Sequence, residues 1–205
     1  MKTARWPILA LLAMTWLSCV ASILPLFEDR FLVSESGLLG AWTGKDSADT
    51  WTFEKGDGKE YLLILRQAEY ELDQGLGNPS KKVPGDAVRF QARLGRLGAG
   101  LFLDLAPADK GNPEIRNDVY NSSMIPGHLL ARVWLEKDSL KIVFLDQDWL
   151  VNAVKDGRIA LAHVETGNWL ILTAPTAELQ ASIVKFGENE KAFPLTDVEE
   201  FHRSK

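Results

Sequence analysis

The sequence predicts a mainly β protein: an antiparallel barrel or strongly bent sheet of about nine strands with two helices, preceded by an N-terminal hydrophobic helix. Three observations carry this prediction. Short apolar runs with period-two alternation recur between turn residues. Two stretches repeat apolar residues at helical spacing instead. A long uncharged run follows the first basic residues. About nine strands is a number typical of an up-and-down barrel or a sandwich.

Four hairpins and one leading strand account for the predicted sheet. The first strand is expected around residues 39–43. The hairpins are expected within residues 49–67, 87–107, 128–146 and 158–174. The first hairpin turns at "GDG", because glycine adopts the positive φ that a tight turn needs. The others turn at a glycine-rich stretch, at "KD" and at "TGN".

Two helices are predicted after the third and fourth hairpins. "DQDWLVNAVKDG" begins with an aspartate that can cap a helix and ends at Gly157. "TAELQASIVKFG" follows Pro175 and ends at Gly187. Its residues Leu179, Ile183 and Phe186 recur at helical spacing, so we expect this stripe to pack on the sheet.

The amino-terminal segment predicts export to the cell envelope. Lys2 and Arg5 precede 22 uncharged residues, Trp6 to Phe27. A signal peptide has a basic start, an apolar stretch of about 7–15 residues and small residues at its cleavage site. A membrane anchor instead needs about 20 apolar residues, which the run just reaches. We therefore expect residues 1–19 to be a signal peptide or a membrane anchor.

The single cysteine, Cys19, is a candidate lipidation site. "LSC" resembles the lipobox of bacterial lipoproteins, in which the cysteine thiol is acylated and becomes the mature amino terminus. Trp16 and Leu17 depart from that motif. Three outcomes stay open: lipid attachment at Cys19, cleavage nearby, and retention of the segment as a membrane helix. All three outcomes place the protein in the cell envelope, and we expect an exported, membrane-associated protein of a bacterial cell envelope.

Composition excludes several classes of partner. The chain has 205 residues, 46% of them hydrophobic and 25% charged, as in ordinary globular proteins. Residues 1–19 hold two basic residues and no acid, so the remainder has 21 basic and 28 acidic residues, a net charge of −7. An acidic body binds phosphate backbones poorly, which argues against nucleic acid. One cysteine and three scattered histidines give no metal-site spacing and no sign of a cofactor.

Six short sequence blocks are distributed along the chain: "ILPLF", "LLGAW", "FLDLAP", "PGH", "LDQDWL" and "LTAPTAELQ". Together they resemble a family of bacterial envelope proteins, many with lipoprotein signals, to which no activity is assigned. Gly40 and Trp42 also resemble the Gly-x-Trp start of lipocalin-like barrels, where the tryptophan closes one end. This resemblance implies an envelope location and a lipocalin-like body, and it supplies no catalytic residues.

Candidate site residues divide into a cavity set and a catalytic set. Tryptophans are numerous for a body of this size, and with neighbouring aromatics they could line an apolar cavity or simply fill a core. The candidate ligand-binding residues are Trp42, Trp51, Tyr61, Phe90 and Trp134. Asp104, Asp146 and His128 could serve a hydrolase if two of them converged in one cleft. The alternatives are a helix cap for Asp146, and for His128 a strand cap or a bond to a backbone carbonyl.

Four segments and three functions follow from these observations. Residues 20–36 are expected to be a linker, residues 37–193 a β-rich lipocalin-like domain and residues 194–205 a charged tail. The leading hypothesis is a non-enzymatic envelope-anchored barrel module, with a small apolar molecule as its candidate ligand and the membrane as its partner. The first alternative is an interaction or structural protein of the envelope with an unidentified protein partner, and the second is a hydrolase.

Overall fold

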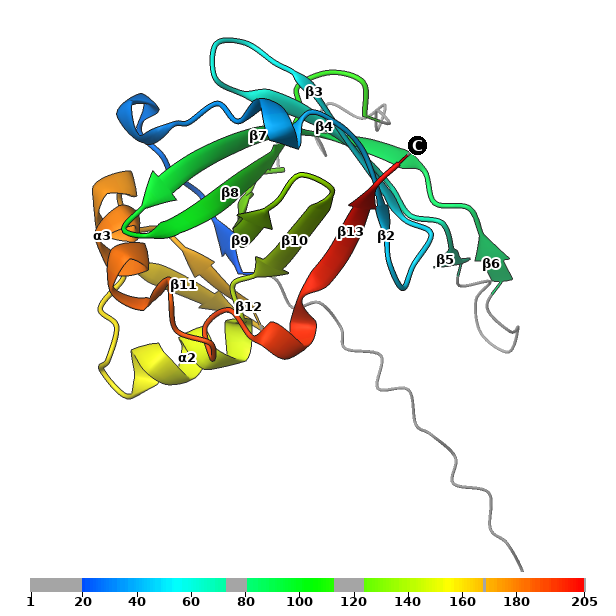
Figure 1. The fold of residues 1–205 in the computed structure, drawn as a ribbon. Helices are drawn as coiled ribbons and strands as arrows, with labels where there is room; N and C mark the ends of the chain where they lie inside the picture. The colour runs from blue at the N-terminus through cyan, green and yellow to red at the C-terminus, as the bar shows by residue number, and fades with distance from the viewer. Residues whose placement is uncertain (1–19, 73–80, 113–123, 168, 205) are drawn as a thin grey trace, which may run out of the picture.

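The computed structural model describes residues 20–72, 81–112, 124–167 and 169–204 (Figure 1). The predicted amino-terminal hydrophobic helix and Cys19 lie outside these residues. No helix of the described part is long and apolar enough to cross a membrane.

Eight antiparallel strands form a closed barrel, which confirms the predicted mainly β class (Figure 1). Each barrel strand pairs with the next one along the chain, and the last pairs with the first, so the barrel has up-and-down order. Closure occurs where β10 pairs with both β9 and β13. The barrel strands are β2 (Gly40–Gly44), β3 (Thr50–Lys55), β4 (Tyr61–Arg66), β7 (Ala87–Leu97), β8 (Gly100–Pro107), β9 (His128–Leu135), β10 (Ser139–Phe144) and β13 (Glu199–Arg203).

Three short strands continue the sheet beyond the first residues of β9. β1 (Ala21–Ser22) pairs antiparallel with β9 and parallel with β12 (Trp169–Leu172). β11 (His163–Thr166) pairs with β12 and ends the sheet. A separate ribbon of β5 (Tyr70–Leu72) and β6 (Lys81–Val83) extends from β4 and β7.

Two α-helices lie where the caps predict them. α2 (Gln147–Lys155) begins after Asp146, whose carboxylate accepts the backbone N–H of Trp149 at 2.6 Å. α3 (Thr176–Phe186) begins after Pro175 and ends before Gly187. The predicted stripe of α3 is buried. Three single 3₁₀ turns complete the description: η1 (Asp29–Phe31), η2 (Ser36–Leu38) and η3 (Leu195–Asp197).

Two hydrophobic cores share the wall of the barrel. The first fills the barrel interior and includes Trp42, Trp51 and Phe53. The second lies outside the wall formed by β7 to β10, between that wall, the β1–β12 strands and the two α-helices. β8 separates the two cores, so residues 102–106 are buried on both faces of the strand. A strand covered on both faces reads as a continuous apolar run, as "FLDLA" does apart from its aspartate.

Two segments expected to lie outside the domain are parts of it. Residues 20–36, predicted as a linker, contain β1, η1 and four buried apolar side chains: Val20, Leu26, Phe27 and Leu32. Residues 194–205, predicted as a charged tail, contain β13, which closes the barrel through the buried Phe201. Both predictions are wrong for the same reason: one strand face or one short apolar stretch is enough to dock a segment against a preformed core.

Candidate functional site

The structure separates the five predicted ligand-binding residues into three places. Trp42, Trp51 and Tyr61 are buried in the barrel interior. Phe90 is half-buried against the same core. Trp134 points outward from β9, packs against the second core and lies under the Arg132 guanidinium, 4.8 Å from the ring centre. One cavity can therefore include the first four residues and excludes Trp134.

Aromatic side chains occupy the middle of the barrel. The ring of Trp51 lies 5.2 Å from that of Phe201 and 6.3 Å from that of Phe53. Phe53 in turn meets Tyr61 edge to face at 6.4 Å. All four rings are at most 4% exposed. Tilted and edge-to-face contacts at these distances stabilise a packed core, so this part of the interior is filled by the protein itself.

Arg203 holds one end of the barrel through Trp42. Its guanidinium stacks 4.3 Å above the Trp42 ring and donates to the carbonyl oxygens of Gly37 and Leu39. The Trp42 indole N–H donates to the carbonyl of Leu38 at 2.9 Å. The last barrel strand, the first barrel strand and the turn η2 are thereby joined. Sequence analysis missed Arg203 because it placed that residue in a tail.

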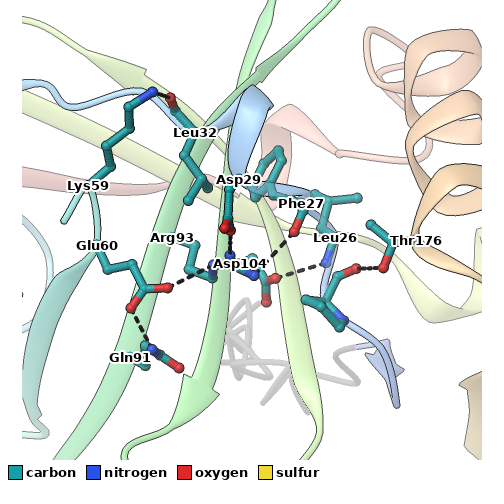
Figure 2. Close-up of polar contacts among 11 residues, drawn as sticks. Leu26, Phe27, Asp29, Leu32, Lys59, Glu60, Gln91, Arg93, Asp104 and Thr176 are labelled. Atoms are coloured by element: carbon teal, nitrogen blue, oxygen red, sulfur yellow. Dashed lines mark hydrogen bonds and ion pairs between the residues drawn. The ribbon is translucent and has the colours of Figure 1, made fainter. Parts of the chain in front are cut away.

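The most elaborate polar site lies on the outer wall, where it holds residues 20–33, here called the strap (Figure 2). Asp104 on β8 is 1% exposed. One of its carboxylate oxygens accepts the backbone N–H of Leu26 at 2.8 Å, and the other lies 2.7 Å from Nδ1 of His128. A buried carboxylate is costly unless it is paired and hydrogen-bonded. The strap supplies one of the two partners that Asp104 needs.

Arg93 binds the strap next to Asp104 (Figure 2). It stands directly opposite Asp104 in the β7–β8 register. Its guanidinium donates to the carbonyl of Phe27 at 3.1 Å and to the carboxylate of Asp29 at 2.6 Å. Glu60 lies 3.1 Å from its Nε and orients the guanidinium from the other side.

Backbone and side-chain contacts continue along the whole strap. Thr176 of α3 donates to the carbonyl of Pro25, and Lys59 donates to the carbonyl of Leu32 (Figure 2). The N–H of Val33 donates to the carbonyl of Leu94 at 2.9 Å. Gly95 makes room for the strap, because a Cβ at this position would lie 2.3 Å from the ring of Phe27. The strap therefore docks on a surface shaped to receive it.

Two of the three predicted hydrolase residues converge, but their contacts are structural. Asp104 and His128 pair directly, which corrects the expectation that His128 bonds a carbonyl. An Asp–His pair activates a side-chain nucleophile only if a hydroxyl or thiol lies beside the second imidazole nitrogen. The strand register places Ser22 opposite His128, yet Ser22 is fully buried and donates to the carbonyl of Leu24. Asp146 caps α2 instead.

An acidic hollow lies at the other side of the barrel, between the β2–β3 turn and the start of β13. Glu199 and Glu200 line it together with Asp46, Asp49 and Lys45. Glu200 forms ion pairs with Lys45 at 2.8 Å and with Lys141 at 3.0 Å, and these two lysines lower its pKa to about 2. Burial raises the pKa of Glu199, and Asp49 raises it further. Within the described residues, no group of three or more His, Cys, Asp or Glu side chains is placed to hold a metal ion.

Replacing Asp104 should loosen the strap. We expect Asp104→Ala to lower the free energy of unfolding by about 3 kcal/mol, because Leu26 and His128 lose a buried partner. Asp104→Asn keeps the shape and one acceptor, so its loss should be smaller. The exposed Asp109→Ala is the control, with a change within about 0.5 kcal/mol. Urea unfolding followed by tryptophan fluorescence measures all three, and an Asp104→Ala variant as stable as the control would contradict this role.

The two glutamates of the acidic hollow should respond to pH in opposite directions. A lowered pKa stabilises the fold above the ordinary value of 4.5, and that contribution disappears as the pH falls towards 2. Glu200→Gln should thus be less stable than the wild type at pH 7 and equal to it near pH 2. A raised pKa destabilises the fold above its ordinary range, so Glu199→Gln should be more stable than the wild type at pH 7 and lose that advantage below pH 4.5. Thermal unfolding across this range checks both signs, and the same sign for both variants would refute the assignment.

Comparison with known proteins finds no match for this chain. No protein-family model matches it, no curated protein matches its sequence, and no solved structure matches its fold. The resemblance to bacterial envelope proteins accordingly stays a prediction from short sequence blocks.

Proposed function

We propose that this chain is a non-enzymatic, membrane-tethered module of the bacterial cell envelope, built on a lipocalin-like barrel that acts as a rigid scaffold. The observation that carries the proposal is the docking of the strap. Eight residues of the uncharged amino-terminal run, 20–27, belong to the folded domain. The eight-stranded up-and-down order and the position of Trp42 on the first barrel strand support the lipocalin-like description.

Because the strap is folded against the barrel, fewer uncharged residues are left to form a membrane helix. Residues 20–27 hold β1 and the buried Val20, Leu26 and Phe27, so they are not available to a membrane helix. The uncharged residues left are 6–19, which number 14. A helix of that length would span about 21 Å, whereas the hydrocarbon core measures about 30 Å. Fourteen residues suit the apolar stretch of a signal peptide, about 7–15 residues long.

This length favours the lipoprotein interpretation of Cys19 over a retained membrane helix. A signal that ends at Ser18 leaves Cys19 as the first residue, one position before the buried Val20. A lipid on that cysteine would hold the protein at the membrane surface with no spacer between the lipid and the domain. The preceding "LS" supplies a small residue at the processing site, and Trp16 and Leu17 remain the departures from the motif.

A binding or structural role fits the chemistry of the described residues better than hydrolysis does. Asp104 and His128 are occupied by the strap and by each other, and Asp146 by the α2 backbone. A rigid barrel that binds other envelope components through its outer surface needs no change in these contacts. The unidentified partner in this interpretation is an envelope protein or the membrane itself.

A small apolar ligand at one barrel end is the second candidate function. In the strand register, the half-buried Leu65, Phe90, Leu129 and Phe144 lie towards the end where β9 begins. An apolar molecule could bind against these side chains without displacing the packed rings below them. Saturable quenching of tryptophan fluorescence by a fatty acid, abolished in Phe90→Ala, would select this candidate over the scaffold.

Membrane tethering through Cys19 has a direct mass signature. We expect the native protein to fractionate with membranes and to carry a mass that corresponds to residues 19–205 plus acyl chains. Cys19→Ala should retain the amino-terminal segment and gain no acyl mass, while Ser18→Ala, which keeps a small residue at that position, should be processed like the wild type. Cell fractionation with intact-mass spectrometry tests the three proteins, and a wild-type chain recovered without acyl mass in the soluble fraction refutes the tether.

A further inference from the structure

The short strands β1, β12 and β11 have one packed face and one bare face. Directly opposite residues in neighbouring strands share a face, and the register aligns Ala21, Ile171 and Val164 in one row. Trp169 lies two residues before Ile171 on β12, and Ile23 lies two residues after Ala21, just past the end of β1, where its N–H donates to the carbonyl of Leu172. Both therefore share the same face. We call these five residues the apolar face. The other side carries the buried Ser22, Leu170 and Leu172, which pack towards the second core.

The apolar face exposes large side chains to solvent. Ile23 is 39% exposed, Trp169 52% and Val164 53%. The register places no charged residue on this side of the three strands: the one remaining position is Thr166. Contiguous exposed apolar surface of this kind marks an interaction site more often than isolated exposed residues do.

Three more exposed apolar side chains adjoin this face. Leu24 follows Ile23 and is 40% exposed. Gly127 lies against Ala21, since a Cβ at Gly127 would be 3.5 Å from that of Ala21. Just before it, Met124 and Ile125 are 57% and 71% exposed.

The chain enters the fold at this face. Val20 is buried, and Ala21 and Ile23 belong both to the uncharged amino-terminal run and to the apolar face. Two residues of chain reach at most about 7 Å, so Cys19 lies within that distance of Ala21. A membrane attachment at Cys19 would therefore hold the apolar face next to the bilayer, because no flexible linker separates the two.

We infer that the apolar face is a bilayer-contacting surface, which enters the interfacial zone of the membrane beside the attachment point. The inference rests on the proposed tether, because the tether brings the face to the lipid. The free energy falls when apolar side chains move from water into the boundary between headgroups and acyl chains. Trp169 suits that position, because an indole ring places its apolar body in the bilayer and its N–H among the headgroups.

Val164 and Val184 make a matched pair for testing this surface. Val184 is an exposed residue of α3, whose buried stripe packs on the second core, and it is not part of the apolar face. It has the same side chain and nearly the same exposure, 56% against 53%. Each is replaced by cysteine in the full chain and labelled with bimane. The chain without an added cysteine gives the background from Cys19.

The labelled proteins are reconstituted into vesicles of phosphatidylethanolamine and phosphatidylglycerol, with or without lipids brominated on the acyl chain. We expect bimane at position 164 to shift to shorter wavelength in vesicles and to be quenched by the brominated lipid. Bimane at position 184 should show neither effect. Protein that sediments with vesicles while both labels behave alike overturns the inference and leaves the tether standing.

The other outcomes identify other occupants. A chain that does not sediment with vesicles overturns the tether itself, together with the inference that rests on it. A blue shift at position 164 that needs no vesicles and grows with protein concentration assigns the face to a second copy of the chain. The same shift at every concentration, without quenching by brominated lipid, assigns it to residues 1–19. Each of these results contradicts the bilayer-contacting surface.

Discussion

A carboxylate lies in the barrel wall between two hydrophobic cores. The docking of the strap on the outside of the barrel depends on how this carboxylate is hydrogen-bonded. Asp104 has access to almost no water, and its partners are the Leu26 N–H and the His128 imidazole. The Leu26 N–H supplies a hydrogen bond that this buried oxygen cannot take from water. Because a buried carboxylate without such a partner is costly, this bond couples the burial of Asp104 to the docking of residues 20–33. Arg93 and Thr176 then fix the carbonyls of Phe27 and Pro25.

The position of the strap determines what the amino terminus can be. The folded domain includes Val20 to Phe27, so residues 6–19 are what is left of the uncharged run. This remainder has about two thirds of the length that a membrane helix needs and the full length of a signal-peptide core. The same docking places Ala21 beside Ile171, in the row that continues to Val164. The proposed tether and the apolar face both depend on this one packing arrangement, although separate experiments test them.

Local signals predicted most of the strands and both helices. The helix ends are marked by Asp146, Pro175 and Gly187, and glycine turns mark the hairpins. Such signals are readable because caps and turns depend on neighbouring residues alone. The strap could not be predicted this way: an apolar run behind two basic residues has the same composition whether it is exported, inserted or folded. Its main bond joins residues 78 positions apart. β13 was missed because Phe201 is the only apolar residue of a strand that otherwise has charged or polar side chains. The lone aspartate within "FLDLAP" was the one visible sign of a buried polar site.

Hydrogen exchange of the native protein tests most directly whether the strap is part of the folded unit. The amides of Leu26 and Val33 donate to Asp104 and to the carbonyl of Leu94, and Leu103 lies in the middle of β8. If the strap unfolds only with the barrel, Leu26 and Val33 should exchange with the same free energy of opening as Leu103. Exchange of Leu26 and Val33 at the rate of an exposed loop, with Leu103 still protected, would show that the strap is a detachable linker and would contradict this account.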